Sequence, residues 1–183
     1  MVFRGCPQVG RPHGIIRTPA PTAFLDRDGV LNIDKGYVHQ WADFEWVDGA
    51  LKAVRYLKKQ AFRVVVVTNQ SGVGRGLYLE SDFLSLSKEI LQLCPIDAVC
   101  YCPDSPEDNC PARKPSPGML EAVDEVFGVS KSSSFLIGDK PSDLAAAEAF
   151  GIPGHHFPGG NLFEFVRSLV RRNNDYFEDT RTS

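Results

Sequence analysis

Residues 22–31 read TAFLDRDGVL and place two aspartates, Asp26 and Asp28, directly after a short apolar run. We expect residues 23–25 to form a strand, at whose end both carboxylates can reach one small space. Two carboxylates this close repel each other unless a cation or a shared proton lies between them. One could then attack an electrophile while the other moves a proton, with a divalent metal shielding the pair. The competing interpretation is an exposed Asp-Gly turn, and the rest of the chain must decide between the two.

The composition of the 183-residue chain is that of an ordinary globular protein, with 43% hydrophobic and 23% charged residues. This length predicts one domain with a substantial core. The net charge of −3 argues against binding to nucleic acid or to an anionic membrane. No apolar run approaches the roughly 20 residues that span a bilayer, and the first residues do not resemble a secretory signal. We therefore expect a cytoplasmic enzyme, and a monomer.

The five cysteines are concentrated in one part of the chain, where four of them fall within seventeen residues. In a chain without an export signal, this clustering favours a metal site or free thiols over a disulfide framework. They are Cys6, Cys94, Cys100, Cys102 and Cys110.

Apolar runs typical of buried strands alternate along the chain with segments of helical periodicity. This alternation predicts a single Rossmann-like α/β domain of three layers around a mostly parallel sheet, over residues 22–175. We expect residues 1–21, rich in proline and glycine, to form an irregular arm, and residues 176–183 a polar tail. The further expected strands are 62–67, 97–101, 134–137 and 154–157, and the expected helices are 50–60, 80–93, 118–127, 142–150 and 161–172.

Polar residues follow three of the expected strands. They are Asp26 with Asp28, Thr68 with Asn69, and Asp139 with Lys140. In parallel α/β sheets, ligands bind beyond the carboxyl ends of the strands, so these clusters should meet. That convergence favours chemistry at Asp26 and Asp28 over a simple turn.

The polar clusters together suit phosphoryl transfer. Thr68 and the backbone N–H groups of the glycine-rich turn after it can hold anionic oxygens. Arg113 and Lys114, in a loop expected at the same edge, add cations suited to phosphate. Asp139 would complete a set of hard oxygen ligands for Mg²⁺. Asp143, one helical turn further on, is interpreted as a cap or a supporting acid rather than a ligand.

The segments FLDRDGVLN, VVVTNQSGVGRG, ARKPSPGM and LIGDKPSD are similar, in order and spacing, to the four motifs of the haloacid dehalogenase phosphatase superfamily. More narrowly, residues 22–157 resemble the capless branch that contains the D-glycero-D-manno-heptose 1,7-bisphosphate phosphatases. The resemblance implies a Mg²⁺-dependent phosphatase that converts this phosphorylated sugar to heptose 1-phosphate through an aspartyl-phosphate, for lipopolysaccharide or capsule precursors. A histidinol-phosphate phosphatase, another small-molecule phosphatase, and an inactive phosphosugar-binding protein are the alternatives.

The resemblance also implies a role for each motif residue. Asp26 would be the nucleophile and Asp28 the general acid and base, while Asp26, Asp139 and the backbone carbonyl of Asp28 would hold Mg²⁺. Thr68 and Lys114 would stabilise the phosphoryl group. The implied substrate-binding residues are Asp34, Lys35, Gly36, Tyr37, Thr68, Asn69, Gln70, Ser71, Arg113, Lys114 and Lys140.

One departure from the family concerns zinc. The family folds its Pro-rich loop around a zinc ion held by three cysteines and a histidine, and the aligned residues here are Cys102, Asp104, Cys110 and Ala112. Structural zinc needs four ligands, and alanine provides none. Cys100 could substitute. Otherwise Cys102 and Cys110 are the remains of a degenerate site, and we expect a zinc-free loop held by its prolines.

Overall fold

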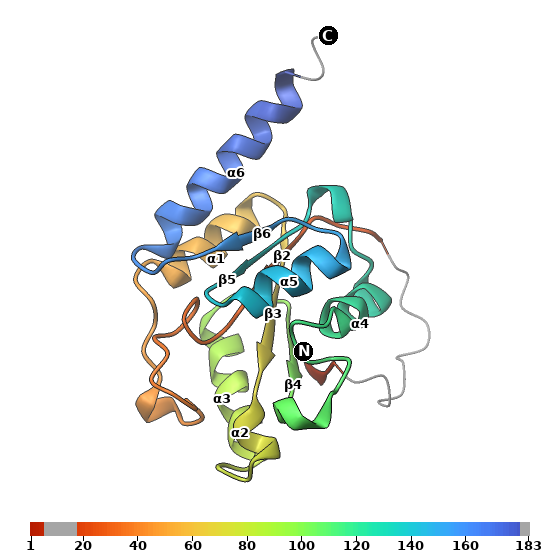
Figure 1. The fold of residues 1–183 in the computed structure, drawn as a ribbon. Coiled ribbons are helices and arrows are strands. Elements are labelled where there is room, and N and C mark those ends of the chain that lie inside the picture. The colour runs from red at the N-terminus through yellow and green to blue at the C-terminus, as the bar shows by residue number, and fades with distance from the viewer. Residues whose placement is uncertain (6–17, 180–183) are drawn as a thin grey trace.

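The computed structural model describes residues 1–5 and 18–179, with side chains as far as Arg171. Six strands form one sheet in the order β1-β4-β3-β2-β5-β6, and every neighbouring pair is parallel. The predicted α/β fold with a parallel sheet is confirmed (Figure 1). The strands are β1 (Val2–Arg4), β2 (Thr22–Leu25), β3 (Arg63–Asn69), β4 (Ala98–Cys102), β5 (Phe135–Gly138) and β6 (Gly154–His156).

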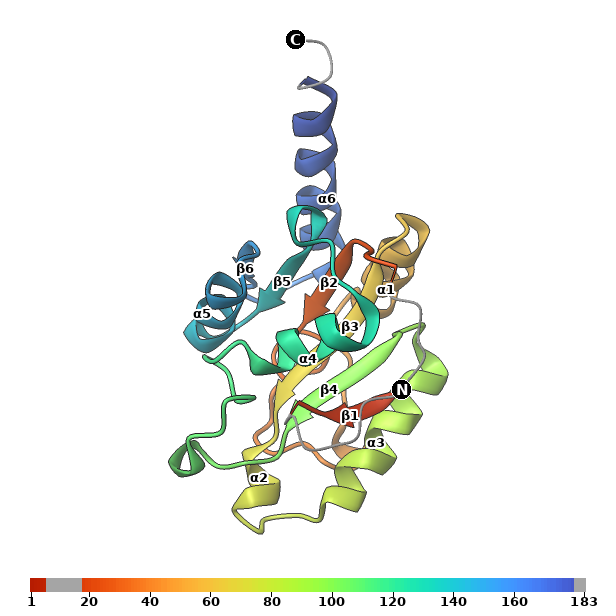
Figure 2. The same cartoon turned by 90° about the vertical axis from the view of Figure 1, so that its right-hand side faces the viewer.

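Helices cover both faces of the sheet, which gives the predicted three layers (Figures 1 and 2). Alternate residues of the central strands point to opposite cores, so Val64 and Val66 lie in one apolar cluster while Val65 and Val67 lie in the other. The first cluster includes side chains of α1 (Ala50–Lys59), α3 (Glu80–Leu93) and α6 (Leu162–Asp179). The second includes side chains of α4 (Gly118–Phe127) and α5 (Pro141–Phe150).

The chain reverses its direction of travel across the sheet at β2. It proceeds from β2 to β3 and β4 on one side, then returns to add β5 and β6 on the other. Phe24 of β2 therefore pairs with both Val65 and Leu136. A reversal of this kind leaves a crevice beyond the carboxyl ends of the strands. Asp26 follows β2 directly and so lies at this crevice.

The connection from β2 to α1 carries no inserted domain. Within residues 26–49, the only helical element is a 3-10 turn at Trp41–Asp43, so the expected capless arrangement is present. We call residues 30–44 the flap, because they lie beside the ends of β2 and β3. The rest of the helical structure consists of α2 (Ser71–Gly74), where we expected only a glycine-rich turn, and 3-10 turns at Pro106–Asp108 and Lys131–Ser133.

Two sequence-based expectations about the ends of the chain are wrong in part. Val2–Arg4 are not irregular, because they pair with β4 as the edge strand β1. The last helix does not end at residue 172, because α6 continues to Asp179 and projects beyond the layered body (Figure 1). Residues 6–17, with Cys6, and residues 180–183 lie outside the described part of the chain.

No helix in the described part of the chain is both long and apolar enough to cross a membrane.

Candidate active site

Asp26 is the most buried acid at the end of β2, with 4% of its surface exposed. Its backbone N–H donates to Ile137 O of β5 at 2.9 Å, which fixes the residue between the two strands. Burial raises the pKa of Asp26 to about 7, with Lys114 opposing and Asp143 and Asp28 adding to the rise. A carboxyl group held in this way needs nearby positive charge to ionise fully.

Asp139 and Asp143 bring two further carboxylates to Asp26. Oxygen atoms of the three side chains lie within 4.8 Å of one another. Asp139 follows β5, and burial raises its pKa. Asp143 occupies the first turn of α5, where its Oδ2 accepts the Lys140 N–H at 3.0 Å. The predicted capping role of Asp143 is therefore present, and the residue also belongs to the carboxylate group.

The carboxylate group has the chemistry of a site for Mg²⁺. Lys114 pairs with Asp26 and Asp143, and the exposed Lys140 Nζ lies 3.9 Å from Asp139 Oδ2. Asp139 Oδ1 is buried without a hydrogen-bond partner among the described residues. Gly29, with a φ of +89°, lies against the Asp139 carboxylate, and a Cβ at this position would collide with it. Hard oxygen ligands with excess negative charge are what Mg²⁺ prefers. The predicted Asp26 and Asp139 fit this ion, and Asp143, predicted as a cap or a supporting acid, lies beside them and pairs with Lys114.

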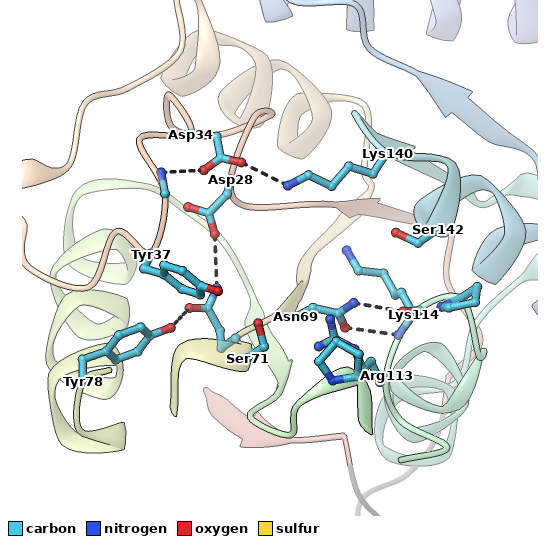
Figure 3. Close-up of a pocket in the computed structure, with 14 residues that line it drawn as sticks. Asp28, Asp34, Tyr37, Asn69, Ser71, Tyr78, Arg113, Lys114, Lys140 and Ser142 are labelled. Atoms are coloured by element: carbon cyan, nitrogen blue, oxygen red, sulfur yellow. Dashed lines mark hydrogen bonds and ion pairs between the residues drawn. The ribbon is translucent and has the colours of Figure 1, made fainter. Parts of the chain in front are cut away.

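Asp28 is held by a network of hydrogen bonds beside the carboxylate group. Arg27 donates to both of its oxygens, Asn32 Nδ2 donates to Oδ1 at 3.0 Å, and Gln70 Nε2 donates to Oδ2 at 3.2 Å. Gln70 also donates to Thr68 Oγ1 at 2.8 Å. Its Oε1 accepts from the Tyr78 hydroxyl at 2.7 Å (Figure 3). These side chains fix the second acid in relation to the end of β3.

Lys114 reaches the acids from the Pro-rich loop that follows β4. Its Nζ lies 2.8 Å from Asp26 Oδ1, 2.5 Å from Asp143 Oδ1 and 2.8 Å from Val67 O. Burial opposes its positive charge, but Asp26 and Asp143 raise the pKa of Lys114 above its ordinary value. The lysine therefore stays charged at the centre of the site.

The backbone of Lys114 is held by the side chain of Asn69, the last residue of β3. Asn69 Nδ2 donates to Lys114 O at 3.0 Å, and Lys114 N–H donates to Asn69 Oδ1 at 3.1 Å (Figure 3). This pair of hydrogen bonds ties the Pro-rich loop to the sheet. Asn69, predicted to bind substrate, thus also makes a contact within the protein.

Two connected cavities open beside these residues. An inner cavity of about 40 Å³ is lined by the two acids that follow β2, together with Thr68, Lys114 and Asp143. An outer cavity of about 520 Å³ lies above it, and Asp28, Asn69, Lys114, Lys140 and Ser142 line both. The inner cavity has room for a phosphoryl group and the outer one for a small sugar.

Most of the predicted substrate-binding residues line the outer cavity. Asp34 Oδ2 pairs with Lys140 Nζ at 3.0 Å, and Asp34 Oδ1 accepts the Gly36 N–H (Figure 3). The flap and Lys140, the residue before α5, therefore meet at one side of this cavity. Lys35 differs, because its Nζ pairs with Glu45 at 2.9 Å and it lines neither cavity. The predicted residues on this lining are Asp34, Gly36, Tyr37, Asn69, Gln70, Ser71, Arg113, Lys114 and Lys140.

The cysteine-containing end of the Pro-rich loop offers three metal-ligand atoms. Those of Cys102, Asp104 and Cys110 lie within 4.8 Å of one another. The fourth aligned position is Ala112, whose side chain is buried in the core. Cys100 does not complete the set, because its thiol donates to Met119 O. The described residues therefore lack the closed set of four ligands that structural zinc requires.

Sequence reasoning missed several contributors to the site. Arg27 contacts Asp28, while Tyr78 and Ser142 line the outer cavity. Arg27 lies inside the motif FLDRDG, so its position was a usable signal. No sequence signal marks Tyr78 or Ser142 as a site residue, because the turn after α2 and the start of α5 bring them to the site.

A family profile described as "Polynucleotide kinase 3 phosphatase" matches residues 22–153. A "D-glycero-beta-D-manno-heptose-1,7-bisphosphate 7-phosphatase" of Escherichia coli (strain K12) is 40% identical over 144 residues, which cover 72% of this chain and 75% of the relative. The chain belongs to this heptose bisphosphate phosphatase family. A family member of the same name from Rhodopseudomonas palustris is 39% identical over 82% of this chain and 90% of its own length.

Solved structures agree with this family assignment. The "D,D-heptose 1.7-bisphosphate phosphatase from B. bronchiseptica complexed with magnesium and phosphate" has a TM-score of 0.71 at 30% identity, covering 81% of this chain and 86% of that one. A "putative had-like phosphatase" from Mesorhizobium loti has a TM-score of 0.69 at 32% identity, with coverages of 82% and 78%. The predicted membership of the haloacid dehalogenase superfamily is confirmed.

Proposed function

We propose that this protein is a phosphatase that removes the 7-phosphate of D-glycero-β-D-manno-heptose 1,7-bisphosphate and leaves heptose 1-phosphate. The observation that carries the proposal is the inner cavity, which Asp26, Asp28, Thr68 and Lys114 line together. These residues supply a nucleophile, an acid and base, and two groups that can hold phosphoryl oxygens. The names of its relatives indicate the substrate.

In the first step, a carboxylate oxygen of Asp26 attacks the phosphorus of the 7-phosphate. The bond between phosphorus and the sugar oxygen breaks, and Asp28 gives its proton to that oxygen. Lys114 Nζ, 2.8 Å from Asp26, lies where it can offset charge on the phosphoryl oxygens. The products are the free sugar hydroxyl and an aspartyl-phosphate.

In the second step, water attacks the phosphorus of the aspartyl-phosphate. Asp28, now a carboxylate, takes the proton from this water, and the bond between phosphorus and Asp26 breaks. Inorganic phosphate leaves and both acids return to their starting states. One residue can serve both steps because Asp28 lines the inner and the outer cavity.

Mg²⁺ would be held by Asp26, Asp139 and the backbone carbonyl of Asp28, with Asp143 adjacent. When bound, it supplies positive charge against the phosphoryl oxygens. The bound magnesium and phosphate named for the B. bronchiseptica relative support this proposal.

The outer cavity would hold the heptose and its second phosphate. Arg113 and Lys140 line this cavity and are the cations available to the phosphate that does not react. Tyr37 and Asp34 of the flap would face the sugar hydroxyls. The prediction of a cytoplasmic monomer that supplies lipopolysaccharide or capsule precursors also belongs to this proposal.

The test measures phosphate release from both anomers of heptose 1,7-bisphosphate. Sugar monophosphates and histidinol phosphate are assayed separately as alternative substrates. The expected result is a kcat/KM that is highest for the bisphosphate, with the 1-phosphate retained in the product. A wide preference for histidinol phosphate would reassign the substrate. Undetectable turnover of every compound at saturating Mg²⁺ would instead indicate a binding protein.

A further inference from the structure

Arg27 lies between the two acids in sequence, yet its side chain is buried, with 1% of its surface exposed. The guanidinium carbon lies 5.5 Å from the centre of the ring of Phe83, a buried residue of α3. Arg27 lines neither the inner nor the outer cavity. Burial of a cation is costly unless acceptors compensate it. Nε and Nη2 of Arg27 meet acceptors, while Nη1 is buried without one among the described residues.

The main acceptor of Arg27 is the carboxylate of Asp28. Nη2 donates to both oxygens, at 2.9 Å to Oδ1 and 2.8 Å to Oδ2, and Nε donates to Oδ2 at 3.1 Å. Asn32 and Gln70 add one hydrogen bond each, so Arg27 makes three of the five that Asp28 accepts from side chains. Only Arg27 engages both oxygens of Asp28 in this network.

A fork of two nitrogens on one carboxylate fixes the plane of that carboxylate as well as its position. Asn32 and Gln70 each touch one oxygen, and neither would by itself prevent rotation of the group. The same guanidinium donates to Val38 O at 2.6 Å, which joins the acid to the flap. Arg27 therefore sets the direction in which Asp28 faces the cavity and links it to the segment above.

We propose that Arg27 is a positioning residue for the proton transfer by Asp28, an inference that rests on the proposed function of that acid. Arg27 would not touch the substrate. It orients the Asp28 carboxyl group toward the oxygen that leaves phosphorus, and a misdirected carboxyl group transfers its proton poorly. The effect of losing Arg27 therefore depends on how much the leaving group needs a proton.

This dependence can be measured with a series of aryl monophosphates of similar size, graded in the acidity of the phenol released. For each enzyme, the logarithm of kcat/KM is plotted against the pKa of the phenol. Proton donation to the leaving group makes this slope shallow, and its loss makes the slope steep. The slope does not depend on the fraction of folded enzyme, because every substrate meets the same preparation.

The variants are Arg27→Lys, which keeps the buried stem and charge but loses the fork, and Arg27→Gln. We expect both to steepen the slope toward that of Asp28→Asn, with kcat/KM for the least acidic phenol lowered about 100-fold. The double variant Arg27→Lys with Asp28→Asn should be no steeper than Asp28→Asn alone. Gln70→Leu, which removes one contact to one oxygen, should steepen the slope less than either.

Arg63→Gln is the matched control. Arg63 also lies over an aromatic ring, that of Phe127 at 5.0 Å, and donates to a carbonyl, Gly128 O at 2.7 Å, but it is remote from the site. Its slope should equal that of the unmodified protein.

The outcomes separate the two claims. If Asp28→Asn steepens the slope and the Arg27 variants do not, Arg27 has no positioning role and the proposed function stands. If Gln70→Leu alone reproduces the slope of Asp28→Asn, Gln70 rather than Arg27 orients the acid, and the inference is overturned even if the Arg27 variants fail to fold. If Asp28→Asn keeps the original slope, the acid role of Asp28 is itself wrong.

Discussion

The ammonium nitrogen of Lys114 lies between two buried carboxylates, 2.8 Å from Asp26 Oδ1 and 2.5 Å from Asp143 Oδ1. The lysine comes from the Pro-rich loop, while the acids follow β2 and begin α5, so this contact joins three segments of the chain. Asp139 contributes a third acid to the same group. Lys114 thus pairs with two of the three carboxylates, and removing it should leave both without their buried cation.

Lys114→Met should abolish most of the activity and also destabilise the metal-free protein. Loss of one partner from a buried ion pair costs about 3–5 kcal/mol, because the other charge is left unpaired. The free energy of unfolding in urea, measured with EDTA present, is expected to fall by that amount. Lys88→Met, at an exposed position of α3, is the control and should change neither quantity. An unchanged unfolding midpoint for Lys114→Met would contradict the geometry described.

The stability of the metal-free protein should fall as the pH rises from 3.8 to about 7 and then level off. Burial raises the pKa of Asp26 to about 7 from its ordinary value of 3.8. Between these values the native protein holds a proton that the unfolded chain has released, so this contribution is complete below the lower value and is lost above the higher one. Thermal unfolding in EDTA across this range measures it. The dependence of stability on pH should be flatter in Asp26→Asn. If the unmodified protein and Asp26→Asn show the same dependence, the raised pKa of Asp26 is contradicted.

The stabilisation produced by Mg²⁺ should grow over the same range of pH. A metal bound to the Asp26 carboxylate competes with its proton, so affinity rises as the proton leaves. The measurement is the increase in Tm on adding Mg²⁺, compared at about pH 5.5 and about pH 8. A larger increase at the lower pH would show that the metal does not bind this carboxylate.

Asn69→Ala should lower kcat more than it lowers stability. The amide of Asn69 holds both the N–H and the carbonyl of Lys114, and a displacement of about 1 Å at a catalytic group can cost roughly 100-fold in rate. Two lost hydrogen bonds cost only about 1–3 kcal/mol of unfolding free energy. Asn161→Ala is a matched control, since the Asn161 amide also makes one donor and one acceptor hydrogen bond: it donates to Asp48 Oδ2 and accepts the Glu164 N–H in the first turn of α6. It should lose stability and keep kcat. Equal kcat values for the two variants would remove the positioning role of Asn69.

The Pro-rich loop should keep its function without zinc. Arg113 Nη1 donates to Asp104 O at 3.0 Å, Gly74 N–H donates to Pro103 O at 2.9 Å, and Ala112 packs in the core, so protein contacts hold both ends of the loop. Elemental analysis of purified protein should find well under one zinc per chain. Double substitution of Cys102 and Cys110 by serine should leave kcat unchanged. One equivalent of tightly bound zinc, lost in the double variant together with activity, would overturn this expectation.

The strand ends were predictable because two local signals agree there. Buried apolar runs indicate parallel strands, and the polar residues that follow Leu25, Val67 and Ile137 meet at one edge. The structure places Asp26, Thr68, Asp139 and Lys114 around one another as expected. Lys114 was expected at the same edge because its Pro-rich loop follows a strand of the sheet, while the resemblance supplied its role beside the phosphoryl group.

Side-chain contacts within the site could not be predicted in this way. The hydrogen bonds of Arg27 to Asp28 and of Asn69 to the backbone of Lys114 depend on tertiary packing rather than on the spacing of residues in the sequence. The strand Val2–Arg4 could not be predicted for a related reason. Three residues before a Pro- and Gly-rich stretch carry no strand pattern of their own, and they form a strand because the edge of β4 is available for pairing. Likewise α2 begins at Ser71 despite two glycines, and a Cβ at Gly72 would collide with the ring of Tyr78.

The central claim is that Asp26 carries the phosphoryl group during turnover. The most direct measurement is a rapid acid quench of the enzyme with heptose 1,7-bisphosphate labelled at the 7-phosphate, followed by location of the label in the peptides. We expect a transient label on the peptide containing Asp26, sensitive to hydroxylamine and absent from Asp26→Asn, which should also be inactive. Label on a different residue, or full turnover by Asp26→Asn, would contradict it.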